Sequence, residues 1–189
     1  MFVLSTSQVL QHLLMAGAVL PLDTLLDIGA GDGHVTACFA PHFRRVFATE
    51  VCPIMVWRLQ RRGYTVLGVD GWTNRTYNVI SCLNVLDRCE RPVTLLRTMR
   101  DHLEPGGLLF VALVLPYCPF VESGAKQLQP IERLEITGSS IEENIASLIR
   151  NVFEPLGLHL QVSNNDNEET KKERKEKKRE REREGGERK

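Results

Sequence analysis

The stretch of sequence that decides the fold is Leu26-Asp27-Ile28-Gly29-Ala30-Gly31-Asp32-Gly33. An apolar run ends in three glycines at alternate positions, and a helix-compatible stretch, residues 35–39, follows. This order predicts a strand, a tight turn and the start of a helix. Glycine suits such a turn because a Cβ would keep the backbone away from a bound ligand. In open α/β sheets, ligands of the nucleotide type bind at this strand-to-helix crevice.

The spacing of the glycines narrows the choice of ligand. Dinucleotide-binding turns follow G-x-G-x-x-G/A, whereas here the third glycine comes one residue earlier, at Gly33. The pattern, preceded by Asp27, resembles motif I of the class I S-adenosylmethionine-dependent methyltransferases. The resemblance implies that Gly29, Gly31 and Gly33 lie against the methionine part of this cofactor and that Asp27 helps to hold the turn. A glycine turn that only closes a βα unit is the alternative.

A second acid supports a cofactor site. Residues 45–50 indicate a strand that ends in the carboxylate of Glu50. Glu50 follows Gly29 by about 20 residues, the offset at which an acid accepts hydrogen bonds from ribose hydroxyls. A solvated acid at a strand end is the alternative, but together with the glycine turn the sequence favours a ribose-binding role.

Composition places limits on the class of protein. A chain of 189 residues, 42% of them hydrophobic, suits one globular domain, expected over residues 1–163. No run approaches the ~20 apolar residues of a membrane span. Five cysteines without C-x-x-C spacing favour reduced thiols. We expect an intracellular protein, either cytoplasmic or associated with the endoplasmic reticulum or mitochondria. The five histidines show no metal-ligand spacing, so no metal is expected.

The formal net charge of zero hides two opposite charges. Residues 171–189 carry a net charge of +5, and the remainder carries −5. No apolar residue occurs from Asn164 onward, so residues 164–189 are expected to be a charged, low-complexity and mostly disordered tail. The acidic body argues against nucleic acid as a partner.

The domain alternates predicted strands with predicted helices. Such alternation indicates a Rossmann-like α/β fold, a mostly parallel sheet with helices on both faces. The predicted strands are residues 24–28, 46–49, 65–69, 77–83, 108–115 and 158–162. The predicted helices are residues 7–15, 34–41, 53–62, 93–102 and 140–153.

A closer resemblance comes from the segment Tyr77-Asn-Val-Ile-Ser-Cys-Leu-Asn84-Val-Leu-Asp87-Arg-Cys89. It is similar to the DREV-type methyltransferase-like family, the protein-histidine N-pros-methyltransferases, as are residues 26–33, 48–50, 66–68, 103–105 and 112–116. The resemblance spans about residues 2–158 and implies methylation of histidine Nδ1 in His-x-His segments of proteins. It implies that Glu50 holds S-adenosylmethionine, that Asn84 lies between cofactor and substrate, and that Asp87 faces the target imidazole.

Those residue types suit the chemistry. Histidine is mostly neutral at pH 7, so its methylation needs positioning more than a strong base. A carboxylate that accepts the Nε2 proton turns the Nδ1 lone pair toward the methyl group, a task for Asp87. If the segment turns helical after its strand, Asn84 and Asp87 point to one face. The alternative for this pair is a helix N-cap at a strand-to-helix junction.

The C-terminal part departs from the family pattern. Residues 158–162 supply a sixth strand, but the charged tail begins where a seventh should follow, and the family's tyrosine-bearing C-terminal segment has no counterpart. We therefore expect an incomplete sheet and an activity that the missing C-terminal segment impairs. We also expect a monomer. A non-catalytic family member acting as an interaction module, and a class I methyltransferase for a small molecule, are the alternatives.

Overall fold

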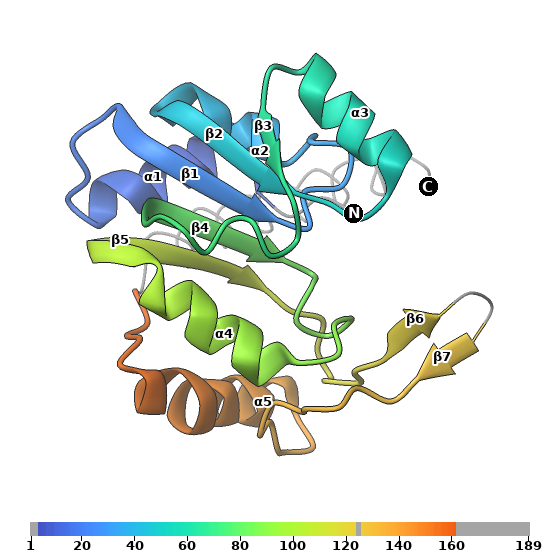
Figure 1. Cartoon of the computed structure of the whole chain (residues 1–189). Coiled ribbons are helices and arrows are strands. Elements are labelled where there is room, and N and C mark those ends of the chain that lie inside the picture. The colour runs from blue at the N-terminus through green and yellow to red at the C-terminus, as the bar shows by residue number, and fades with distance from the viewer. Residues whose placement is uncertain (1–3, 124–125, 162–189) are drawn as a thin grey trace, which may run out of the picture.

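A computed structural model describes residues 4–123 and 126–161, and the predicted tail, residues 164–189, lies outside them. Five parallel strands form the main sheet in the order β3-β2-β1-β4-β5 (Figure 1). They are β1 (Leu22–Ile28), β2 (Phe43–Thr49), β3 (Thr65–Leu67), β4 (Tyr77–Leu83) and β5 (Leu103–Ala112). The chain order changes direction at β1 and β4, and a ligand crevice is expected at such a switch point.

Helices cover both faces of the sheet, because successive strand residues point to opposite sides. On one face, α1 (Thr6–Met15) and α2 (Thr36–Phe39) pack through Leu13 and Phe39 on Leu25 and Val79. On the other, α4 (Pro92–Asp101) and a π-helical turn (Leu148–Phe153), which continues α5 (Ile141–Ser147), cover the core around Leu26 and Ile80. The remaining helical elements are α3 (Pro53–Arg61) and 3₁₀ turns (Ala40–His42, Glu154–Leu156).

The sequence-based prediction for the fifth strand was wrong at both ends. The prediction began at Leu108 after a Pro-Gly-Gly turn, but β5 begins at Leu103. Tyr77 pairs with Leu103 and Val79 with Leu108, so residues 104–107 form a bulge within the strand. A Cβ on Gly107 would lie 2.8 Å from the carbonyl oxygen of Glu104. The glycine is therefore needed for a bulge rather than for a turn that precedes the strand.

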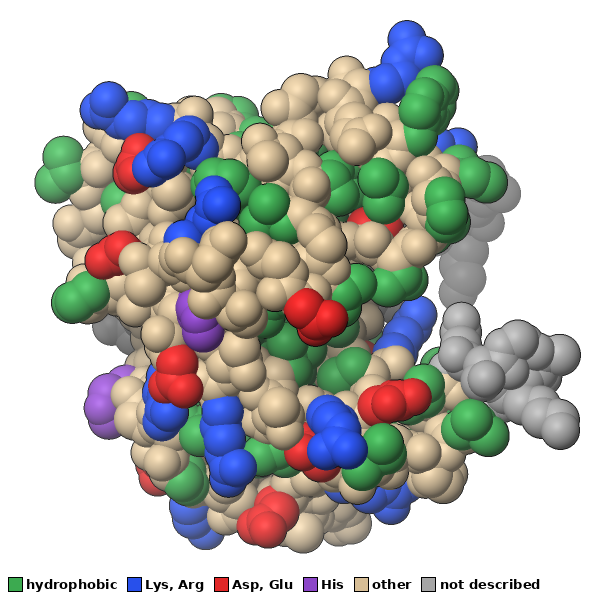
Figure 2. Space-filling model, in the orientation of Figure 1, with side chains coloured by type: hydrophobic (Ala, Val, Ile, Leu, Met, Phe, Trp, Pro, Cys, Tyr) green, Lys and Arg blue, Asp and Glu red, His purple; other side chains and the backbone are tan. Residues whose placement is uncertain are grey.

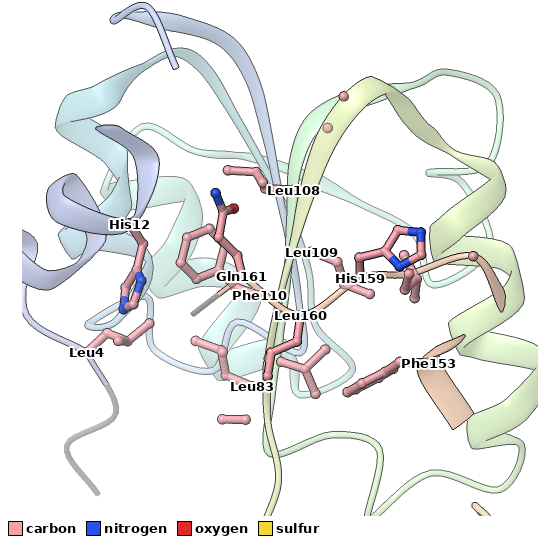
Figure 3. Close-up of a pocket in the computed structure, with 16 residues that line it drawn as sticks. Leu4, His12, Leu83, Leu108, Leu109, Phe110, Phe153, His159, Leu160 and Gln161 are labelled. Atoms are coloured by element: carbon pink, nitrogen blue, oxygen red, sulfur yellow. The ribbon is translucent and has the colours of Figure 1, made fainter. Parts of the chain in front are cut away.

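The predicted sixth strand does not form. Residues 158–161 have no strand structure, and Val162 lies outside the described residues. Within the described part of the chain, β5 is thus the last strand of the main sheet, and its outer edge has no strand partner. A groove of about 750 Å³ runs along this edge (Figure 3). Leu4 and His12 line one side of β5, and Phe153 and His159 line the other.

A short antiparallel hairpin follows β5. It consists of β6 (Val121–Ser123) and β7 (Lys126–Leu128), and it projects from the body on the side where the carboxyl ends of the strands lie (Figure 1). No helix among the described residues is long and apolar enough to cross a membrane.

Candidate active site

The glycine turn after β1 has the backbone that its sequence predicts. Gly29 and Gly31 have φ values of 67° and 57°, in the left-handed region that favours glycine. A Cβ on Gly29 would lie 2.5 Å from Cγ2 of Val85, which follows β4. A Cβ on Gly31 would meet nothing within 4 Å. The first glycine therefore permits packing against the β4 loop, and the second leaves open space beside the turn.

Glu50 directly follows β2, the strand beside β1, and its carboxylate contacts this turn. Its Oε2 accepts a hydrogen bond from the Gly31 N–H at 2.8 Å. Its Oε1 accepts bonds from the N–H groups of Val51 (2.7 Å) and Cys52 (3.0 Å). Three backbone amides thus fix the carboxylate, whose oxygens keep further lone pairs for ligand hydroxyls.

Asp27 lies beneath the turn and is buried, with 3% of its surface exposed. Its carboxylate accepts hydrogen bonds from the hydroxyls of Thr36 (2.5 Å) and Ser81 (2.7 Å). Burial raises the pKa of Asp27 to about 6, although the two hydroxyls oppose the shift. Asp27 therefore links β1 to α2 and β4, and this geometry gives it a part in holding the turn.

Asn84 and Asp87 lie in the loop that follows β4. The Asn84 N–H bonds the carbonyl of Ala112 at 2.9 Å, and its φ is +57°, the one positive value among the described non-glycine residues. Asp87 is 4% exposed. Its Oδ1 has no hydrogen-bond partner among the described residues, and its Oδ2 lies 3.9 Å from Nε of Arg88. A buried polar atom without a partner is costly and points to a functional role.

The structure decides against the helix-cap alternative for this pair. The segment after β4 forms turns rather than a helix, and α4 begins at Pro92 with Arg91 at its N-cap. The expectation that helical spacing brings Asn84 and Asp87 to one face is therefore wrong. Between them, Val85 lies beside the glycine turn, with its Cγ2 2.5 Å from the position of a Cβ on Gly29.

Several contributors to the site were not found from the sequence. Thr36 and Ser81 bond Asp27, and the Thr49 hydroxyl accepts a 3.4 Å bond from the Gly29 N–H. Thr49 directly precedes Glu50, which is the only local signal for any of them.

Comparison with known proteins places this geometry in a family. The model of the DREV methyltransferase family matches residues 1–164. The chain belongs to this family. Its five-stranded parallel sheet with helices on both faces is the Rossmann-like class I methyltransferase arrangement that the sequence predicts.

Solved structures that resemble the chain include methyltransferases. One, from Clostridium acetobutylicum ATCC 824, is 18% identical with a TM-score of 0.48, over 56% of this chain and 48% of that chain. The amino pentose methyltransferase CalS10 from Micromonospora echinaspora, solved with S-adenosylmethionine, is 23% identical (TM-score 0.49; 57% and 49%). The N-methyltransferase NodS from Bradyrhizobium japonicum WM9, solved with S-adenosyl-L-homocysteine, is 25% identical (TM-score 0.46; 56% and 58%). The chain spans about half the length of these structures.

Proposed function

We propose that this chain binds S-adenosyl-L-methionine and methylates the Nδ1 atom of histidine in His-x-His segments of proteins. Membership of the DREV methyltransferase family supports the class of reaction. The observation that carries the choice of acceptor is the buried Oδ1 of Asp87, which has no partner among the described residues. An imidazole N–H is a donor that matches such an oxygen.

The residues around the glycine turn fit the cofactor. The space beside Gly31 is open, and the Glu50 carboxylate that accepts the Gly31 N–H lies at the same turn. Glu50 would bind the ribose hydroxyls, and Gly29, Gly31 and Gly33 would lie against the methionine part. When bound, S-adenosylmethionine supplies an electrophilic methyl group on its sulfonium. Asp27 would act from below by fixing the turn through Thr36 and Ser81.

The chain's own residues then have two tasks in the reaction. Asp87 would accept a hydrogen bond from the Nε2–H of the target histidine, which fixes the tautomer with the Nδ1 lone pair free. The same carboxylate would stabilise the positive charge that develops on the ring during transfer. Asn84, held at the end of β4 by the carbonyl of Ala112, would orient the ring against the cofactor. No strong base is required, because histidine has a reference pKa of ~6.5.

A methyl-transfer assay tests this proposal. The purified chain is incubated with isotopically labelled S-adenosylmethionine and a His-Ala-His peptide, and the modified atom is identified by mass spectrometry and NMR. We expect label on Nδ1, and retained cofactor affinity with a loss of at least about 100-fold in turnover for Asp87→Asn. Asp101→Asn, an exposed acid at the end of α4, is the matched control and should behave as wild type.

Two results would contradict the proposal in different ways. Label on another atom or side chain would refute the histidine Nδ1 assignment and leave methyl transfer intact. Cofactor binding without any transfer to histidine-containing proteins would instead support a non-catalytic family member.

A further inference from the structure

The β6–β7 hairpin is attached at both of its ends to the loop that carries Asp87. We call residues 84–91 the acceptor loop. Before the hairpin, the Phe120 N–H donates to the backbone carbonyl of Asp87 at 2.9 Å. After it, the Glu132 N–H donates to the backbone carbonyl of Glu90 at 3.0 Å. Backbone bonds of this kind set the position of the hairpin relative to the acceptor loop whatever the side chains are.

Side chains reinforce the same attachment. The guanidinium of Arg88 lies 5.8 Å from the ring centroid of Phe120, within reach of a cation–π contact. The Glu132 carboxylate accepts bonds from the Thr94 N–H (2.8 Å) and hydroxyl (2.6 Å) at the start of α4. These hydrogen bonds hold the pKa of Glu132 below its usual value. The hairpin base and the acceptor loop are thus one structural unit.

The hairpin offers a surface that nothing in the described chain covers. Within the described residues, β6 and β7 pair only with each other, so their outer edges lack strand partners. Val121 and Leu128 are direct cross-strand partners. Leu128 is 48% exposed and Ile131 is 62% exposed. Figure 2 shows hydrophobic side chains at the surface beside the base of the hairpin. Exposed apolar side chains next to unpaired strand edges form a surface that suits the binding of an extended polypeptide.

We propose that Leu128 and Ile131 dock an extended segment of the acceptor protein, with an apolar side chain near the residue to be methylated. This inference rests on the proposed function and adds the surface that selects the substrate. Its occupant is a polypeptide because strand edges pair with backbone N–H and C=O groups, which a sugar or lipid lacks. Continuity with the acceptor loop brings the residues next to the docked segment to Asp87.

The test is an equilibrium binding measurement that does not depend on turnover. The probe is a fluorescein-labelled His-Ala-His peptide with leucines on both flanks, titrated with protein in the presence of S-adenosyl-L-homocysteine. The double variant Leu128→Asp/Ile131→Asp should raise the Kd by about tenfold or more. The control Val19→Asp changes a residue that is 86% exposed in the loop between α1 and β1, before the amino end of β1, and should not change the Kd.

The outcomes separate this inference from the proposed function. Affinity for S-adenosyl-L-homocysteine and far-UV circular dichroism should be unchanged in both variants, because the substituted side chains are exposed. A double-variant Kd within twofold of wild type overturns the inference, and so does a wild-type protein that does not bind the peptide. Wild-type methylation together with an unaffected double variant leaves the proposed function standing. Peptide binding that the double variant loses, without methylation by the wild type, supports docking and refutes the reaction.

Discussion

Two of the three glycines at the turn, Gly29 and Gly31, offer a perturbation that separates fold stability from cofactor binding. Alanine at Gly29 adds a left-handed residue at φ +67° and a Cβ 2.5 Å from Val85. The backbone costs about 1–2 kcal/mol, and overpacking adds about 1–3 kcal/mol. Alanine at Gly31 adds the backbone cost alone, because its Cβ would meet nothing within 4 Å. Gly29→Ala should therefore lose about 1–3 kcal/mol more of unfolding free energy than Gly31→Ala.

The clash with Val85 can be isolated by a double-mutant cycle. Val85→Ala removes the methyl group that the new Cβ would meet. The variant Gly29→Ala/Val85→Ala should be more stable than the sum of its two single changes by about 1–3 kcal/mol. The stabilities are measured by urea unfolding followed by circular dichroism.

Cofactor binding should follow a different order. The methyl group of Gly31→Ala enters the open space assigned to S-adenosylmethionine, so this variant should bind S-adenosyl-L-homocysteine at least about tenfold more weakly while folding well. Calorimetry measures the affinity. Wild-type affinity in Gly31→Ala would refute the assignment of this space to the cofactor. Equal stabilities of the two alanine variants would refute the packing argument for Gly29.

Three further predictions concern the acids of the site. The pKa of Asp27 is raised from 3.8 to about 6, above its unfolded value, so about 3 kcal/mol of stability is present below pH 4 and is lost as the pH rises through 6. Asp27→Asn should remove this component, and urea midpoints at pH 4 and pH 7 measure it; an unchanged pH dependence would contradict the assignment. Glu50→Gln should weaken S-adenosyl-L-homocysteine binding by about tenfold or more, because a neutral amide replaces the ribose-binding carboxylate, and calorimetry that finds wild-type affinity would exclude that role. Ser81→Ala should lower the melting temperature while sparing the Asp87 chemistry, since the hydroxyl bonds Asp27 at 2.7 Å, and a normal melting temperature would show that this bond does not hold the turn.

The central strands could be predicted from the sequence because their patterns are local. β4 has the predicted bounds, Tyr77–Leu83, and β1 ends at Ile28 before the glycine turn. A strand buried on both faces gives a continuous apolar run, and glycines mark its end. The contact of Glu50 with the turn is also suggested by a short-range spacing, while its binding of ribose stays a prediction.

What the sequence did not reveal depends on partners far away in the chain. Pro105 and Gly106 suggest a turn, but pairing of Leu103 with Tyr77 makes them part of a bulge within β5. The alternation of Leu158 and Leu160 suggests a strand, but strand structure requires an edge that residues 158–161 do not join. The bond of Ser81 to Asp27 joins residues 54 positions apart. None of these contacts has a local sequence pattern.

The most direct test of the account is calorimetry of the purified wild-type chain with S-adenosyl-L-homocysteine. We predict one site per chain, with an affinity that falls in Gly31→Ala and Glu50→Gln and stays at the wild-type value in Asp101→Asn. A folded wild-type protein with no affinity for this ligand would contradict the placement of the cofactor at the glycine turn beside Glu50. The same conclusion would follow if Gly31→Ala and Glu50→Gln both kept the wild-type affinity.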